Sequence, residues 1–159
     1  SELSFWEGSI AIFVKESQKG MIGLSLAFSL KQKGKNVTVF FVNPIKKYSE
    51  GKTIRSKQDL FSNLKEPFTI LVDAMNDREE PLSVLEEEVI SYINQIPAFK
   101  VSLDMNSGLS ISHGFTKIAF ISDLTIAIGS YTPGHFLNMA KDYISCFILC
   151  FKKKMQKCF

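Results

Sequence analysis

The sequence predicts an α/β protein of three layers, in which an open, mostly parallel sheet carries helices on both faces. Apolar runs of strand length alternate along the chain with segments of helical periodicity, as in proteins built around a parallel sheet. The first run is continuously apolar, as expected of a strand that is covered on both faces. With 159 residues, 45% of them hydrophobic, the chain fits a single domain over residues 1–159 with one sizeable core.

The first third of the chain predicts a βαβ unit. Leu24 and Phe28 follow one another at helical spacing, and Gly34 is typical of the position just past a helix C-terminus. A right-handed crossover would then join two parallel strands. The elements expected here are a strand over 9–14, a helix over 21–33, a strand over 36–42 and a polar surface loop over 43–55.

The remaining elements continue the alternation of helices and strands. Ser56 is a suitable N-cap, and Pro81 suits the first turn of a helix. Residues 86–88 are three glutamates, which we interpret as the solvated face of that helix. The expected elements are helices over 57–65, 81–95 and 135–142, strands over 68–72, 99–103, 124–128 and 144–151, and a short extended segment over 117–121.

Acidic and polar residues stand where two of these strands end. Asp73 directly follows the third strand, and Asp104 ends the fourth, ahead of Asn106, Ser107 and Gly108. Because the carboxyl ends of parallel strands face the ligand crevice of an α/β sheet, these side chains are well placed to contact a ligand. Asp and Asn also bond nearby backbone N–H groups in turns, so a purely structural role is the alternative.

The loop after the first strand bears on dinucleotide binding. A nucleotide-binding loop needs the spacing G-x-G-x-x-G, so that backbone N–H groups can approach a pyrophosphate at the helix N-terminus. Gly20 and Gly23 supply the last two glycines, but Gln18 stands in place of the first, and Lys19 adds a positive charge. Asn43 replaces the acid that normally closes the second strand. The pattern argues against an ordinary NAD-dependent dehydrogenase.

Charge and cysteine content limit the remaining classes of function. The net charge of +3 is accounted for by the lysines of a basic tail, residues 152–159. A near-neutral body argues against a broad nucleic-acid-binding face. Three cysteines without a C-x-x-C pair favour buried, reduced thiols in a cytoplasmic protein over disulfides or zinc. The longest apolar stretch near the end of the chain is too short to span a bilayer, and we expect no membrane partner.

The order of elements and a set of short motifs resemble the YjeF N-terminal domain family over about residues 10–151. The family's Asp-Ile-Pro-Ser-Gly is similar to Asp104-Met105-Asn106-Ser107-Gly108, and its Asp-Ala after the third strand is similar to Asp73-Ala74. Its Ala-Asp-Leu-Thr strand, followed by Lys-Pro-Gly, resembles Ser122-Asp123-Leu124-Thr125 followed by Thr132-Pro133-Gly134. The resemblance implies a Rossmann-like fold. The family includes the NAD(P)H-hydrate epimerases and the C-terminal domain of the enhancer of mRNA decapping proteins.

The loop after the first strand departs from the epimerases. Those enzymes carry Gly-Pro-Gly-Asn-Asn-Gly-Gly-Asp-Gly, which helps to hold a potassium ion and the cofactor, where residues 15–23 read Lys-Glu-Ser-Gln-Lys-Gly-Met-Ile-Gly. Lys19 stands in place of an Asn and would put a positive charge where a cation should bind, which is electrostatically unfavourable. Thr132 replaces the Lys of Lys-Pro-Gly. Lys19-Gly20-Met21-Ile22-Gly23 instead resembles the Lys-Gly-x-x-Gly of the decapping enhancers, which are dimeric scaffolds.

The resemblance therefore implies two main alternative functions, with a lipid- or apolipoprotein-related binding role left as a third. As a scaffold of the decapping-enhancer type, the domain would be non-catalytic, would form a homodimer and would bind mRNA-decay proteins or RNA. As a divergent epimerase, it would interconvert the R and S epimers of hydrated NADH or NADPH, with Asp104 as the acid/base and Asp73 as a potassium ligand. The loop substitutions and the basic tail favour the scaffold, whereas the preserved Asp104 and Ser107 favour the epimerase. The expected ligand contacts are Lys19, Gly20, Gly23, Asp73, Asn76, Asn106, Ser107, Gly108 and Thr132.

Overall fold

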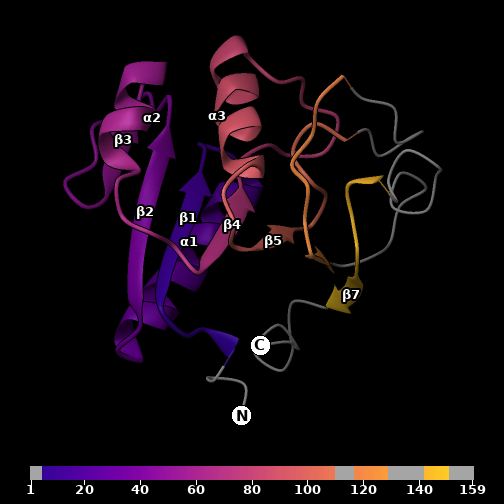
Figure 1. Cartoon of the computed structure of the whole chain (residues 1–159), viewed down its shortest axis with the longest axis horizontal. Coiled ribbons are helices and arrows are strands. Elements are labelled where there is room, and N and C mark those ends of the chain that lie inside the picture. Colours follow the sequence, from indigo (N-terminus) through magenta and orange to yellow (C-terminus); the bar gives the residue numbers. More distant parts are fainter. Residues whose placement is uncertain (1–4, 110–116, 129–141, 151–159) are drawn as a thin grey trace.

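A computed structural model describes residues 5–109, 117–128 and 142–150 of the chain. Its strands form one seven-stranded sheet in the order β3-β2-β1-β4-β5-β6-β7, which runs from left to right in Figure 1, and every pairing between these strands is parallel. The strands are β1 (Ser9–Val14), β2 (Asn36–Val42), β3 (Lys52–Ile54), β4 (Ile70–Ala74), β5 (Phe99–Leu103), β6 (Leu124–Ile128) and β7 (Phe147–Cys150). The described helices are α1 (Gln18–Gln32), α2 (Lys57–Asn63) and α3 (Val84–Asn94).

Two apolar clusters on opposite faces of the sheet make the three layers. One contains Ala27 and Leu30 of α1 together with Ile10 and Ile12 of β1. The other contains Leu60 of α2, Val89 and Ile90 of α3, and the alternate residues Ala11 and Phe13 of β1. Because successive strand residues point to opposite faces, β1 supplies side chains to both clusters. The expected three-layer α/β class with a parallel sheet is confirmed.

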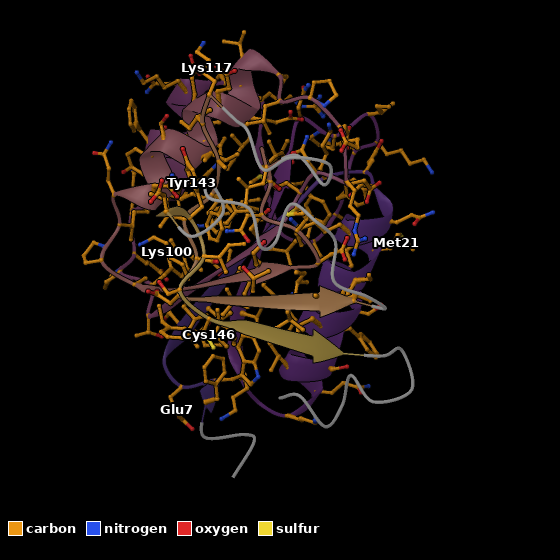
Figure 2. All side chains as sticks on the ribbon, turned by 90° about the vertical axis from the view of Figure 1, so that its right-hand side faces the viewer. Glu7, Met21, Lys100, Lys117, Tyr143 and Cys146 are labelled. Carbon is orange, nitrogen blue, oxygen red and sulfur yellow. The ribbon has the colours of Figure 1, made fainter. Side chains whose placement is uncertain are left out.

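The strand order reverses between β1 and β4, the position where open α/β sheets have their ligand crevice. The chain moves outward in one direction from β1 to β3 and in the other from β4 to β7, so the order reverses between these two central strands. Figure 2 looks onto the β7 edge, where β6 and β7 point the same way. Met21 in the first turns of α1 is labelled at the end toward which the strands point, and Lys100 and Cys146 at the opposite end.

Helix α1 begins three residues earlier than its apolar spacing predicts. Ser17 is the N-cap, and its side chain accepts a hydrogen bond from the backbone N–H of Gly20 at 2.9 Å. Capping therefore sets the start of the helix, and the first polar residues belong to it. The outer face of α1 is apolar as well, with Phe28 at 63% exposed, so spacing alone does not identify the buried stripe.

Other expectations for the first two thirds of the chain were inaccurate, including the end of the helix 57–65, which is observed as α2, Lys57–Asn63. The polar segment 43–55 contains β3, a strand of three residues that pairs with β2 and is too short to show a period in the sequence. The strand expected over 68–72 is observed two residues later in the chain, as β4. Helix α3 begins after Pro81, because Ser83 and Glu86 form a reciprocal capping box there.

In the last third of the chain, both predicted strands are observed. The strand 124–128 is confirmed as β6, and the final strand is shorter than expected, as β7. Residues 117–121 form no strand. The expected helix 135–142 lies almost wholly outside the described residues. Cys146 is exposed, contrary to the expected buried thiol. Within the described ranges no helix combines the length and the apolar character needed to cross a membrane.

Candidate functional site

A crevice of about 520 Å³ opens at the carboxyl ends of the central strands, beside the N-terminus of α1. Two of the predicted site residues, Lys19 and Asp104, border it. The remaining lining residues are Gln18, Ile22, Asp77, Arg78 and Ile128. The crevice therefore lies at the edge of the sheet where the sequence placed the site.

The ammonium group of Lys19 is enclosed by oxygen atoms at the base of this crevice. Its Nζ atom lies 2.6 Å from the carbonyl oxygen of Met105, 2.9 Å from Oδ2 of Asp73 and 3.2 Å from Oγ of Ser107. Oγ of Ser102 lies at 3.5 Å. Lys19 is 2% exposed and Asp73 is 0% exposed, so this is a buried ion pair. Burial of both charges is tolerated because each finds an opposite charge and hydrogen-bond partners.

The carboxylate of Asp73 also accepts hydrogen bonds from uncharged groups around it. Ser107 donates from both its backbone N–H, at 2.7 Å, and its hydroxyl, at 2.6 Å. The hydroxyl of Ser102 and the backbone N–H of Met75 donate at 3.0 and 3.2 Å. Strands β4 and β5 and the loop that follows β5 thus converge on one buried anion.

Asp104 is held by Arg78 at the mouth of the crevice. The Nε atom of Arg78 donates to Oδ2 of Asp104 at 2.6 Å, and its NH2 group donates to Oδ1. The two side chains are 25% and 19% exposed. The Asp104 carboxylate, through its hydrogen bond and charge, raises the pKa of Arg78 above the ordinary value, against the opposing effect of burial. Asp104 also has a φ of +67°, a left-handed conformation that is uncommon for a residue other than glycine.

The N-terminus of α1 already binds a carboxylate of the same chain. The backbone N–H groups of Gln18 and Lys19 donate to the two carboxylate oxygens of Asp77, at 3.1 and 2.9 Å. The positive end of a helix is an anion site, and in nucleotide-binding folds a phosphate occupies it. Here the side chain of Asp77 takes that position.

The polar residues after Asp104 face the protein interior. Asn106 is 1% exposed, and its Nδ2 donates to the carbonyl oxygens of Phe120 and Tyr143. Ser107, also 1% exposed, accepts a hydrogen bond from the backbone N–H of Asn76 at 3.0 Å. Gly108 has a φ of +97°, and a Cβ there would lie 2.3 Å from the carbonyl oxygen of Ile118. This segment ties the loop after β5 to its neighbours.

Gly20 and Gly23 are required by packing. A Cβ on Gly20 would lie 1.8 Å from the carbonyl oxygen of Lys15, and one on Gly23 would lie 2.4 Å from Cβ of Ala74. These glycines let α1 lie close to β1 and β4. Their expected role as ligand contacts stays a prediction.

A second charged cluster lies beside the site and was missed from the sequence. Lys15 forms ion pairs with Glu80 and Glu86, and Nδ2 of Asn76 donates to Glu86 at 3.3 Å. Burial would raise the pKa of Glu86, but bonds from Lys15 and Ser83 outweigh it and lower that pKa below its ordinary value. The same glutamates overcome the opposing effect of burial and raise the pKa of Lys15. Glu86 is 2% exposed, so the expectation that it lies on a solvated face was wrong.

The structure brings several predicted residues together and leaves one unplaced. Lys19, Asp73 and Ser107 are in direct contact, and Asn76 joins them through Ser107. Thr132 lies outside the described residues. Sequence reasoning missed Arg78, and only its place in a polar loop could have hinted at it. Oδ1 of Asn76 is buried and has no hydrogen-bond partner among the described residues.

The epimerase resemblance implies a bound potassium ion and a dinucleotide cofactor, and these contacts show whether the site has room for either. Lys19 Nζ already stands among the oxygens around Asp73, so a potassium ion does not fit beside it without strong repulsion. Asp77 likewise stands where the phosphate of a dinucleotide would meet the helix N-terminus. Among the described residues there is no cluster of three His, Cys, Asp or Glu side chains for a metal ion.

Comparisons with known proteins agree with the fold. No curated protein matches the chain. Among solved structures, the crystal structure of yeast ynu0 (YNL200c) is similar, with a TM-score of 0.68 at 12% sequence identity. The match covers 87% of this chain and 65% of the yeast chain, so this chain spans less than two thirds of that protein. Residues 3–134 match the family described as YjeF-related protein N-terminus, and the chain belongs to this family.

Proposed function

We propose that this chain is a non-catalytic scaffold domain of the YjeF N-terminal family, similar in role to the C-terminal domain of the mRNA-decapping enhancers. The observation that carries the proposal is the bidentate ion pair between Arg78 and Asp104. An acid/base catalyst must exchange a proton with its substrate through a carboxylate oxygen within hydrogen-bond reach. Both oxygens of Asp104 are engaged by a guanidinium that keeps its charge at all physiological pH values.

Two further contacts support the proposal, because they give polar groups of the crevice partners from within the chain. Asp77 binds the N–H groups at the start of α1, and Lys19 neutralises Asp73. A ligand with a phosphate group or a bound cation would have to displace these internal partners. On this proposal the domain acts through its surfaces, by self-association into a homodimer and by binding mRNA-decay proteins or RNA in the cytoplasm.

The second candidate function is a divergent NAD(P)H-hydrate epimerase. The left-handed backbone of Asp104 favours it, because strained conformations of non-glycine residues concentrate at functional sites. The crevice of about 520 Å³ beside Asp104 provides space for a ligand. In this case Arg78 would have to release Asp104 before the carboxylate could reach a substrate.

An epimerase assay separates the two candidates. Purified R-epimer of hydrated NADH is supplied, and its conversion to the S-epimer is followed by chiral chromatography. We expect conversion at the spontaneous rate for both the wild type and Asp104→Asn. Conversion well above that rate, lost in Asp104→Asn, would instead establish the epimerase.

A second measurement tests the scaffold directly. We expect sedimentation equilibrium of the wild-type chain to give the mass of a dimer, with the same result for Asp104→Asn. A strictly monomeric chain at concentrations well above micromolar would contradict the proposed self-association.

A further inference from the structure

The oxygen atoms around Lys19 Nζ form the kind of ligand set that binds a monovalent metal ion. They comprise a carboxylate oxygen of Asp73, the carbonyl oxygen of Met105 and the hydroxyl oxygens of Ser107 and Ser102, at 2.6 to 3.5 Å from Nζ. Carboxylate, carbonyl and hydroxyl oxygens are the ligands that hard cations prefer. The set is buried, since Asp73 and Ser102 are both 0% exposed.

The geometry around Nζ also differs from that of an ordinary lysine ion pair. An ammonium group has three N–H donors, whereas four oxygens surround it, and the Ser102 oxygen lies at the limit of hydrogen bonding, 3.5 Å. A spherical ion has no such directional limit and could contact all four. The four oxygens also come from three different segments of the chain, β4, β5 and the loop after β5.

Asp73 needs a positive charge whatever supplies it. Its carboxylate accepts bonds from Ser102, Ser107 and Met75, and these neutral donors leave a full negative charge inside the protein. An uncompensated buried charge costs several kcal/mol. Lys19 supplies the compensation from a fixed position, because Ser17 and Asp77 hold the first turn of α1.

We propose that Lys19 is a tethered cation that occupies a monovalent-cation site of the fold, so that the protein needs no bound metal ion there. Shortening the side chain would then open the site to K⁺. This inference does not depend on the proposed scaffold function, since it concerns only the charge balance and stability of the fold around Asp73.

The test compares the thermal stability of Lys19→Ala in different salts of equal ionic strength. Melting temperatures are measured for the full chain in potassium, sodium and choline chloride. The wild type should melt at the same temperature in potassium and choline chloride. Lys19→Ala should melt well below the wild type in choline, and K⁺ at about 100 times its Kd should raise its Tm on the order of 5 °C or more.

Two controls make the response specific to this cluster. Lys35→Ala removes a lysine whose carboxylate partner, Glu7, is 70% exposed, so it leaves no buried charge and should show no preference between potassium and choline. The double variant Lys19→Ala, Asp73→Asn removes the buried charge, and its stability should no longer depend on K⁺. Lys19→Asn, which leaves a short amide side chain in the first turn of α1, should respond to K⁺ as Lys19→Ala does.

A direct reading comes from crystals of Lys19→Ala soaked in thallium(I), whose anomalous signal should lie between Asp73, Met105 and Ser107. The proposal is overturned by a folded Lys19→Ala or Lys19→Asn that responds equally to potassium and choline. It is equally overturned if both variants fail to fold in every salt, because K⁺ would then be unable to replace the ammonium group. Epimerase activity plays no part in these readings.

Discussion

Glu86 links helix α3 to the loop that carries the candidate site. Its carboxylate accepts a hydrogen bond from the backbone N–H of Ser83 at 2.6 Å and forms an ion pair with Lys15 at 2.7 Å. A run of three glutamates is usually a solvated helix face. Here the first of them is buried because the capping box turns it back toward the start of the helix.

The lowered pKa of Glu86 predicts how stability depends on pH. In the folded protein this pKa lies below 4.5, so the carboxylate stabilises the fold above about pH 4.5, and the contribution is lost as the pH falls through the folded pKa. Glu86→Gln should lower the free energy of unfolding by about 1–3 kcal/mol at pH 7. The difference from the wild type should shrink at pH 3. Urea denaturation at the two pH values measures it.

Glu88→Gln, on the same helix, is the matched control, and it should change stability by less than about 0.5 kcal/mol at either pH. A Glu86→Gln variant whose deficit is equal at pH 7 and pH 3 would show that the charge is not what matters.

At the scale of elements, the N-terminus of α1 is capped and is also anchored to the residue that follows β4. The hydroxyl of Ser17 accepts from Gly20 N–H at 2.9 Å and donates to the carbonyl oxygen of Met75 at 2.7 Å. Ser56 caps α2 in the same way, by accepting from Asp59 N–H at 3.2 Å, but in an exposed position. The Ser17 side chain therefore makes a second hydrogen bond in addition to its cap, which the Ser56 side chain does not make among the described residues.

This difference predicts unequal costs for two similar substitutions. Ser17→Ala should destabilise the protein by about 2–3 kcal/mol, because it removes both the cap and the bond to Met75, just after β4. Ser56→Ala should cost about 0.5–1 kcal/mol, the value of an exposed cap alone. Chemical denaturation of both variants checks the order, and equal costs would mean that the bond to Met75 contributes nothing.

At the scale of the whole molecule, one sheet joins both apolar clusters. Alternate residues of β1 belong to different clusters, Ile12 to that of α1 and Phe13 to that of α2 and α3. Neither cluster can be exposed without disturbing the strands that carry the other. Trp6, the single tryptophan, is 1% exposed within the α1 cluster and reports on that face.

Unfolding should accordingly be a single cooperative transition. Trp6 fluorescence and far-UV circular dichroism should give the same urea midpoint, as expected of a two-state domain. If the fluorescence changed at a lower urea concentration than the dichroism, the α1 face would unfold independently and the shared-strand argument would be wrong.

The accuracy of the sequence prediction differed between elements for physical reasons. Strands β1, β2, β5 and β6 were predicted with their observed bounds, since continuous apolar runs between polar loops are local signals. Strand β3 was missed, because three residues at an edge carry no period. The starts of α1 and α3 were misplaced, because capping bonds set them and apolar spacing does not show such bonds.

For the site, the sequence by itself determined which loops meet and which residue types they bring. The positions of Lys19, Asp73 and Asp104 relative to strand ends were enough to place them at one edge of a parallel sheet. Only the tertiary structure decided how they pair. Lys19 and Asp73 are separated by 54 positions in sequence and Arg78 and Asp104 by 26, so their contacts depend on strand order and side-chain direction. Lys19, whose charge argues from the sequence against a bound cation, supplies in the structure the positive charge that pairs with the buried Asp73.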